Sequence, residues 1–217
     1  MSIKDQTYHQ QDFSHQDLQQ QVYEGCQFIK CSFDRADLRD AKFINCKFIE
    51  AQALEGCSFQ YANLKDASFE NCMLAMSQFV GADCFGIEFR KCDLKGANFQ
   101  RANFVNRISH SAYFCSAYIT GCNLSYANFE RALLEKCELF ENRWSGANLF
   151  GASMLGAELS RGEFSKEQWG TFNLESADLT HVDLEGLDMR RVSLNGVKIC
   201  DWQQEQLLSK FGLIVIG

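Results

Sequence analysis

A period of five residues constrains this chain more than any other feature of its sequence. In the run from Phe89 to Phe104, a large apolar residue stands at every fifth position and polar residues fill most places between. A small residue, such as Ala97 or Ala102, lies two positions before such a centre. This spacing matches neither the 3.6 residues of a helical turn nor the alternation of a strand. Self-similarity at a fixed short period is typical of repeat architectures.

The same frame extends in both directions. Backwards it reaches Leu54, slips by one residue and continues from Phe48 towards the N-terminus. Forwards it fails at Ser109, resumes at Phe114 and runs to Ile199. Apart from Ser109, every centre is apolar, whereas apolar residues make up 46% of the whole chain. The repeat therefore predicts one elongated domain over residues 1–200.

A pentad with two inward residues predicts a coil that turns a corner at every repeat. Four pentads close a square coil of about twenty residues, at the short end of solenoid repeats. Coils stacked at roughly 4.8 Å pair their backbone groups with the coils above and below. The result is a rod about 45 Å long, with the centres and small residues inside.

The register also explains most of the eleven cysteines. A cysteine two positions before a centre, where other pentads have alanine, is interpreted as a small buried hydrophobic residue. Zinc binding and disulfides are the alternatives, although the chain has no CxxC pair. Cys72 and Cys92 would stack at a distance that permits a disulfide, which a reducing cytoplasm would keep open. The cysteines in this position are Cys26, Cys31, Cys46, Cys57, Cys72, Cys92, Cys122 and Cys137.

The composition excludes several classes of function. A net charge of −7 argues against direct binding of nucleic acid, which requires a basic stripe. The N-terminus has no apolar segment typical of a secretory signal, and no apolar run approaches the length of a membrane span. We therefore expect a soluble cytoplasmic protein.

Individual pentads carry a family resemblance. ADLRD at 36–40, ANLKD at 62–66, ANFQR at 97–101 and ADLTH at 177–181 fit the pattern A(D/N)LXX. On these residues the chain resembles the pentapeptide-repeat family. The resemblance implies an all-β fold, a right-handed quadrilateral parallel β-helix.

Longer stretches narrow the resemblance. FCSAY at 114–118, CNLSYAN at 122–128, LEKCELFENRW at 134–144 and the closing GLIVIG at 212–217 resemble the Qnr group of quinolone-resistance proteins. This resemblance implies that the chain binds DNA gyrase and topoisomerase IV and protects them from fluoroquinolones. It also implies DNA mimicry as the mode of contact, and two loops that engage the enzyme.

Two interruptions of the frame predict projecting loops. The slip near residues 49–53 predicts a short one. Over 105–113 the centre would be Ser109 and the small residue Arg107, which could not fill the core. We expect a loop there, with a degenerate coiled pentad as the alternative, because binding residues gather on loops of rigid scaffolds. The predicted partner-binding residues are Val105, Asn106, Arg107, Ile108, Ser109, His110, Ser111 and Tyr113.

The repeat stops after Ile199, and residues 201–217 form a predicted C-terminal unit. Residues 201–211 predict a helix with Asp201 as N-cap and Gly212 after its end, with an apolar face that could plug the coil. The apolar strand that follows has nothing left to cover it, which predicts a two-fold dimer, as in related pentapeptide proteins. The predicted interface residues are Trp202, Leu208, Phe211, Leu213, Ile214, Val215 and Ile216.

An acidic surface is the other candidate site. Between Lys166 and Arg190 the chain has no lysine or arginine. In a coil of about twenty residues, acidic residues spaced by one coil share a column that faces solvent. Such a rod could compete with DNA for a basic groove; the alternative is a solvated face that maintains solubility. The predicted acidic face comprises Glu138, Glu158, Asp178, Asp183 and Glu185.

No enzyme is predicted. The four histidines are scattered, and the pair His110 and Cys115 lacks the third residue that would orient a nucleophile. The glycines form no phosphate-binding fingerprint, so we expect no cofactor, metal site or small-molecule substrate. The leading hypothesis is topoisomerase protection. The alternatives are a gyrase-inhibiting DNA-mimic regulator and a pentapeptide-repeat scaffold with an unrelated protein partner.

Overall fold

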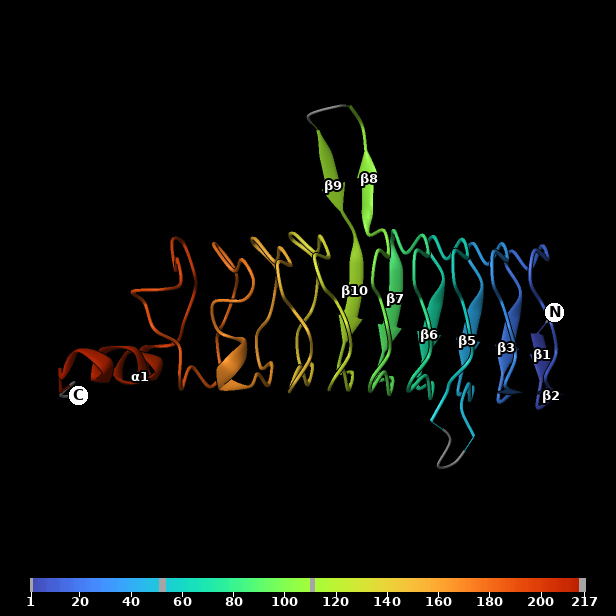
Figure 1. Cartoon of the computed structure of the whole chain (residues 1–217), viewed down its shortest axis with the longest axis horizontal. Helices are drawn as coiled ribbons and strands as arrows, with labels where there is room; N and C mark the ends of the chain where they lie inside the picture. The colour runs from blue at the N-terminus through green and yellow to red at the C-terminus, as the bar shows by residue number, and fades with distance from the viewer. Residues whose placement is uncertain (1, 51–53, 110–111, 215–217) are drawn as a thin grey trace.

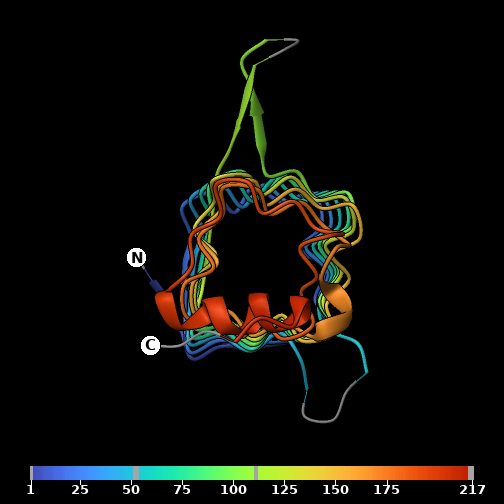
Figure 2. The same cartoon turned by 90° about the vertical axis from the view of Figure 1, so that its left-hand side faces the viewer.

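The chain winds into a four-sided rod of stacked coils. The computed structural model describes residues 2–50, 54–109 and 112–214. Figure 2 looks along the rod and shows its square cross-section, while Figure 1 shows the two termini at opposite ends. The predicted four-sided β-helix is confirmed.

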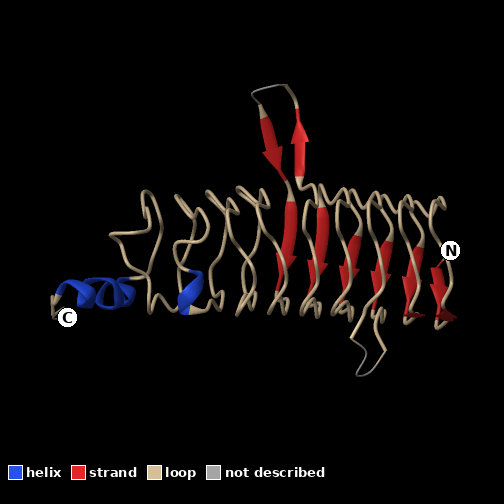
Figure 3. Ribbon diagram, in the orientation of Figure 1, coloured by secondary structure: helices blue, strands red, loops and turns tan. Residues whose placement is uncertain are grey.

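Short parallel strands form the sides of the rod in its N-terminal half (Figure 3). One side carries a six-stranded sheet. In order, its strands are β1 (Ser2–Lys4), β3 (Val22–Glu24), β5 (Lys42–Ile44), β6 (Ser68–Glu70), β7 (Ile87–Arg90) and β10 (Ala117–Thr120). A second side pairs β2 (Thr7–His9) with β4 (Gln27–Ile29). Elsewhere single parallel bridges join the coils, such as the bridge between Asn128 and Asn148, 20 positions apart.

The interior is filled by columns of like side chains. Phe33 stacks on Phe59 with ring centroids 4.9 Å apart, and Phe79 stacks on Phe99 at 4.7 Å. These separations match the spacing of neighbouring strands, so each ring rests on its equivalent in the next coil. The eight small-position cysteines are buried, and all are free thiols.

The regular corners place the second residue after a centre in the left-handed region. Gly96 has φ +67° and Arg101 has φ +61° at equivalent corners. Glycine adopts this conformation without strain because it has no Cβ. At Arg101 the following residue closes the turn, since Ala102 N–H donates to the Phe99 carbonyl at 2.9 Å.

The first loop is longer than predicted. The Gln60 backbone N–H bonds to Asp34, 26 positions away, where regular coils pair residues 20 positions apart. Six residues are therefore inserted at this place, so the loop predicted near 49–53 is present but is longer than a one-residue slip. Leu54, predicted as a buried centre, is 84% exposed. The loop closes where Cys57 N–H donates to the Phe48 carbonyl at 3.0 Å.

One later pentad is also remodelled. A 3₁₀ turn, η1 (Lys166–Gln168), brings Gln168 into the interior in place of the predicted centre Trp169. The Gln168 amide donates to the carbonyls of Trp144 and Ala147 at 3.0 and 2.9 Å. It thus satisfies two buried backbone groups that an apolar side chain would leave unpaired.

The C-terminal unit lies beyond the last coil (Figures 1 and 2). It consists of η2 (Asp201–Gln203), α1 (Gln204–Leu208) and η3 (Ser209–Phe211). Cys200, rather than the predicted Asp201, is the residue that caps its start. Gly212 ends it with φ +72°, the left-handed conformation expected after a helix.

The plug of the coil differs from the predicted apolar face. The buried residues are Gln203 and Leu207, whereas Trp202 and Phe211 are about half exposed. The Gln203 amide donates to the carbonyls of Leu179 and Val182 at 2.8 and 2.7 Å, the arrangement that Gln168 makes earlier in the rod. A polar amide therefore closes the end, because the last coil still presents carbonyls that need donors.

Candidate functional site

A β-hairpin projects from one corner of the rod (Figures 1 and 2). Strands β8 (Val105–Arg107) and β9 (Tyr113–Cys115) are antiparallel, with Asn106 opposite Phe114. Towards the tip, the backbone N–H groups of Ile108 and Ser109 donate to the Ala112 carbonyl at 2.9 and 3.1 Å. The excursion is therefore an ordered ribbon up to these residues. His110 and Ser111 lie outside the described residues.

The hairpin is longer than the loop expected over 105–113. Asn123 bonds to Asp93, 30 positions away, so ten residues are inserted relative to regular coils. The predicted return of the frame at Phe114 is wrong, because its side chain is 45% exposed. The interior resumes with Ala117 and Ile119, which are buried.

The hairpin presents a cationic and apolar surface. The Arg107 guanidinium lies 5.8 Å from the centre of the Tyr113 ring, a cation–π contact across the two strands. Ile108, near the tip, is 73% exposed. The hydrogen bond that the Tyr113 hydroxyl donates to the Glu135 carboxylate, 3.1 Å long, raises the Tyr113 pKa. Tyr113 is therefore a neutral donor at physiological pH.

Cys115 ends β9 at the base of the hairpin. Burial raises the pKa of its thiol, so the reactive thiolate is disfavoured. His110, the candidate base of a nucleophile pair with Cys115, lies outside the described residues. What the structure describes here is suited to binding rather than to nucleophilic chemistry.

The acidic face is only partly a column. Parallel bridges join Glu138 to Glu158 and Glu158 to Asp178, so these three residues stack in successive coils. The column ends at Lys198, whose ammonium lies 3.9 Å from the Asp178 carboxylate. Stacked carboxylates repeat at about the strand spacing of 4.8 Å. Glu138 and Glu158 are exposed and available to a partner.

Asp183 and Glu185 do not belong to this column. Asp183 accepts a hydrogen bond from the Gln206 amide at 2.9 Å. Glu185 pairs with Lys166, with nitrogen and oxygen 2.5 Å apart. Both carboxylates therefore make contacts with other residues of the C-terminal end of the rod. The acidic column consists of Glu138, Glu158 and Asp178.

Four of the predicted dimer residues are exposed apolar side chains of the C-terminal unit, and Leu208 is half-buried. Leu213 is 55% and Ile214 is 88% exposed, and Trp202 and Phe211 are about half exposed. The Arg190 guanidinium lies 6.0 Å from the centre of the Phe211 ring. Val215 and Ile216 lie outside the described residues.

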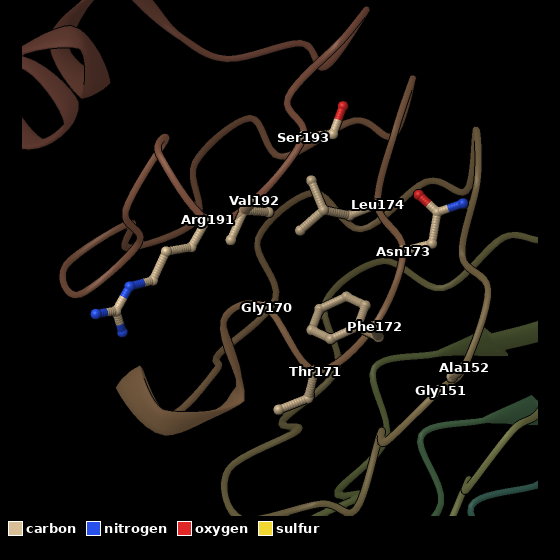
Figure 4. Close-up of a pocket in the computed structure, with 10 residues that line it drawn as sticks. All are labelled: Gly151, Ala152, Gly170, Thr171, Phe172, Asn173, Leu174, Arg191, Val192 and Ser193. Carbon is tan, nitrogen blue, oxygen red and sulfur yellow. The ribbon is translucent and has the colours of Figure 1, made fainter.

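A groove is lined by residues from three of the last coils (Figure 4). It has a volume of about 330 Å³, with Phe172, Leu174 and Val192 at its centre and Arg191 pointing away from it. The residues that line it contain no nucleophile paired with a base. Across the ranges that the structure describes, no group of three or more His, Cys, Asp or Glu could hold a metal ion. Nor is any helix in these ranges long and apolar enough to cross a membrane.

Some residues at the site escape sequence reasoning. Phe85 and Glu135 contact the hairpin from neighbouring coils. Each stands just after a centre, at a position where the pentad tolerates any residue. Phe85 and Glu135 differ from other residues at this pentad position only because they lie beside the inserted hairpin. Their position there depends on how the coils stack, which the sequence does not show.

The coils, the inward columns and the left-handed corners define the class of protein, a pentapeptide-repeat solenoid. Two family models agree with this assignment. The one described as "Pentapeptide repeat region" matches residues 22–99, and the one described as "Pentapeptide repeats (8 copies)" matches 112–139 and 172–198. The chain belongs to the pentapeptide-repeat family.

Within that family the chain is similar to the Qnr proteins. "Pentapeptide repeat protein VPA0095" of Vibrio parahaemolyticus is 70% identical over 167 residues, 77% of each chain. "Quinolone resistance pentapeptide repeat protein QnrB96" of Scandinavium goeteborgense is 46% identical over 155 residues, which cover 69% of this chain and 60% of that protein. Full-length QnrB1, "a plasmid-mediated fluoroquinolone resistance protein", matches with a TM-score of 0.92 and 42% identity over 98% of this chain and 100% of that structure. Qnr proteins are not enzymes.

Proposed function

We propose that this protein binds bacterial type II topoisomerases, DNA gyrase and topoisomerase IV, and protects them from fluoroquinolones. The observation that carries the proposal is the likeness to QnrB1, a fluoroquinolone resistance protein, over 98% of this chain. A match over nearly the entire rod includes the regions that bear the hairpin and the acidic column.

The acidic column supports a mechanism of approach by mimicry. DNA presents regularly spaced negative charge along a narrow rod. The column of Glu138, Glu158 and Asp178 presents carboxylates at a regular rise along a rod of protein. Complementary charge steers this surface towards the basic groove that normally holds DNA. Dimerisation through the C-terminal end would double the acidic surface by symmetry.

The hairpin then supplies the specific contacts. Strands β8 and β9 project away from the coil (Figure 2), and Arg107, Ile108 and Tyr113 are the described residues suited to binding. Inserted into the enzyme, they destabilise the cleavage complex that the drug traps. The protein acts by binding alone in the cytoplasm, with no cofactor and no direct contact with nucleic acid.

A second candidate is a gyrase inhibitor that mimics DNA and has no drug-specific role. The acidic column favours this candidate, because a charged rod can compete with DNA for a basic groove by itself. Such inhibition would not require the hairpin. The hairpin favours protection, because it adds a surface that mimicry alone does not use. A scaffold with an unrelated partner is the third possibility.

The deciding experiment is gyrase supercoiling at an inhibitory ciprofloxacin concentration, with this protein titrated in. Protection predicts that supercoiling returns as protein is added. Loss of activity both with and without the drug would identify an inhibitor instead. No change in either condition would reject the link to topoisomerases.

A further inference from the structure

One face of the projecting hairpin is directed towards the N-terminal end of the rod, and the other face is directed towards the C-terminal end. Side chains alternate along a strand, so neighbours in β9 point to opposite faces of the ribbon. Phe114 contacts Phe85, in a coil that precedes the hairpin. Tyr113 contacts Glu135, in the coil that follows it. The hairpin therefore stands between two coils and touches both.

The contact on the N-terminal side is aromatic. The rings of Phe85 and Phe114 meet edge to face, with centroids 5.2 Å apart and planes at 77°. This is a preferred geometry for a pair of aromatic rings. Since Phe85 belongs to the coil, the ring of Phe114 cannot swing away without losing the contact.

The contact on the C-terminal side is a chain of two hydrogen bonds. The Tyr113 hydroxyl donates to Glu135 Oε2 at 3.1 Å, and the Ser153 hydroxyl donates to Glu135 Oε1 at 2.8 Å. Both carboxylate oxygens are therefore engaged. Ser153 lies in the following coil and holds the Glu135 carboxylate in place. The carboxylate in turn holds the Tyr113 hydroxyl.

We infer that Phe85 and Glu135, two residues outside the hairpin, are positioning residues that hold it upright as a preformed projection. An isolated two-stranded hairpin is marginally stable in water, so its own backbone pairing does not set its direction. Contacts from two coils oppose tilting towards either end of the rod. The partner consequently meets Arg107 and Ile108 in a fixed place, without the entropic cost of ordering a loop.

The consequence for drug protection rests on the proposed function, but the positioning itself is measurable on the protein alone. Amide hydrogen exchange of the hairpin peptide, read by mass spectrometry, reports how often the hairpin opens. Glu135→Ala and Tyr113→Phe each remove the same hydrogen bond. Each is expected to speed exchange about fivefold, the effect of one such bond.

Coupling and rescue separate positioning from general destabilisation. The double variant Glu135→Ala/Tyr113→Phe is expected to exchange no faster than either single variant, because the bond is already lost. Glu135→Gln keeps an acceptor oxygen for Tyr113 and is expected to behave like the wild type. Additive effects, or a Gln variant as fast as the Ala variant, would overturn the assignment of Glu135.

Each positioning residue has a matched control. Glu175 occupies the same pentad position as Glu135 two coils further on, so Glu175→Ala removes an equivalent charge away from the hairpin. Phe150 is an exposed phenylalanine after another centre, so Phe150→Ala matches Phe85→Ala. The hairpin is expected to exchange faster only in the Phe85 variant of that pair. Equal exchange in Phe85→Ala and wild type would reject the aromatic half of the proposal.

Supercoiling in the presence of ciprofloxacin then links positioning to function. If the wild type protects, Glu135→Ala is expected to need a severalfold higher concentration for the same protection. Faster exchange with unchanged protection would show that the partner does not use a preformed hairpin. If the wild type gives no protection while exchange still responds to Glu135→Ala, the proposed function fails and the positioning stands.

Discussion

The side-chain carbonyl of Asn142 accepts a hydrogen bond from the backbone N–H of Cys122, at 2.8 Å. Asn142 occupies the small position that cysteines hold in the preceding coils. There Cys72 N–H donates to the Cys92 sulfur at 3.4 Å, and Cys92 N–H donates to the Cys122 sulfur at 3.3 Å. Asn142 thus ends a ladder of thiols, and its amide also donates to the Leu139 carbonyl at 2.9 Å.

Replacing Asn142 is expected to destabilise the rod. Asn142→Ala leaves buried backbone groups of Cys122 and Leu139 without a partner, and each such group costs free energy. We expect the free energy of unfolding to fall by about 2–3 kcal/mol. Urea denaturation followed by circular dichroism measures the change.

The matched variant is Asn142→Cys, which extends the thiol ladder by one coil. A thiol offers Cys122 N–H the same kind of acceptor that Cys122 offers to Cys92. We expect this variant to lose less than half as much stability as the alanine variant. Equal losses would mean that volume, rather than hydrogen bonding, decides this position.

The regular part of the fold could be predicted because the pentad is a strong and repeated signal. Each centre is buried by the same geometry, so one column such as Phe59, Phe79 and Phe99 follows directly from the period. The errors occur where an apolar residue stands in frame by coincidence. Leu54 and Phe114 fit the count but lie in inserted segments, and a count of residues cannot detect an insertion that preserves the spacing.

The candidate site was predictable only in its broad position. Arg107 and Ser109 break the pentad because neither can fill a core, which places an excursion there. The sequence does not reveal that residues 105–107 and 113–115 pair as a ribbon, nor that Glu135 braces it. Both depend on contacts between coils, which arise only after the rod has formed. Gln168 and Gln203 escaped notice for the same reason.

Alkaline pH is expected to unfold the rod. Burial raises the pKa of Cys137 from 9.0 to about 12 and that of Tyr23 from 10.0 to about 12. Above pH 9 the unfolded chain releases these protons before the folded chain does. Their contribution to stability is therefore complete below about pH 9 and is lost as pH rises towards about 12.

The slope of the free energy of unfolding against pH shows which ionisable groups cause the loss of stability. Each group that ionises only in the unfolded chain contributes about 1.4 kcal/mol per pH unit. Cys137→Ala is expected to reduce the slope between pH 9 and 11 in urea titrations. Alanine fits that column, since Ala117 and Ala157 are buried in the coils on either side. An unchanged slope would exclude Cys137 as a contributor.

Excising the hairpin is expected to abolish protection and leave the rod folded. Removing residues 106–115 shortens the separation of Asp93 and Asn123 from 30 positions to the regular 20. Circular dichroism and thermal unfolding are expected to resemble the wild type. Supercoiling in ciprofloxacin is expected to stay inhibited, and protection by a well-folded deletion would remove the hairpin from the mechanism.

Neutralising the acidic column is expected to weaken binding to gyrase. Glu138→Gln, Glu158→Gln and Asp178→Asn together remove three charges that face one partner surface. We expect about tenfold weaker binding at low salt, with a smaller difference at high salt because exposed charges are screened. Surface plasmon resonance at two salt concentrations measures both effects.

The control removes the same net charge elsewhere. Asp40→Asn, Glu70→Gln and Glu175→Gln neutralise three carboxylates outside the column. If mimicry depends on the regular spacing, this variant keeps nearly wild-type affinity. Equal weakening by both triple variants would mean that total charge, rather than the column, attracts the enzyme.

The exposed C-terminal residues are expected to hold a dimer together. Ile214, 88% exposed, and Leu213, 55% exposed, form an apolar surface at the end of the rod, where contact with a second copy removes it from water. Leu213→Asp/Ile214→Asp places charges in that contact and is expected to give a monomer by light scattering. Leu54→Asp alters an equally exposed apolar residue on the first loop and is expected to leave the mass unchanged. A wild-type chain that is already monomeric at high concentration would rule out this interface.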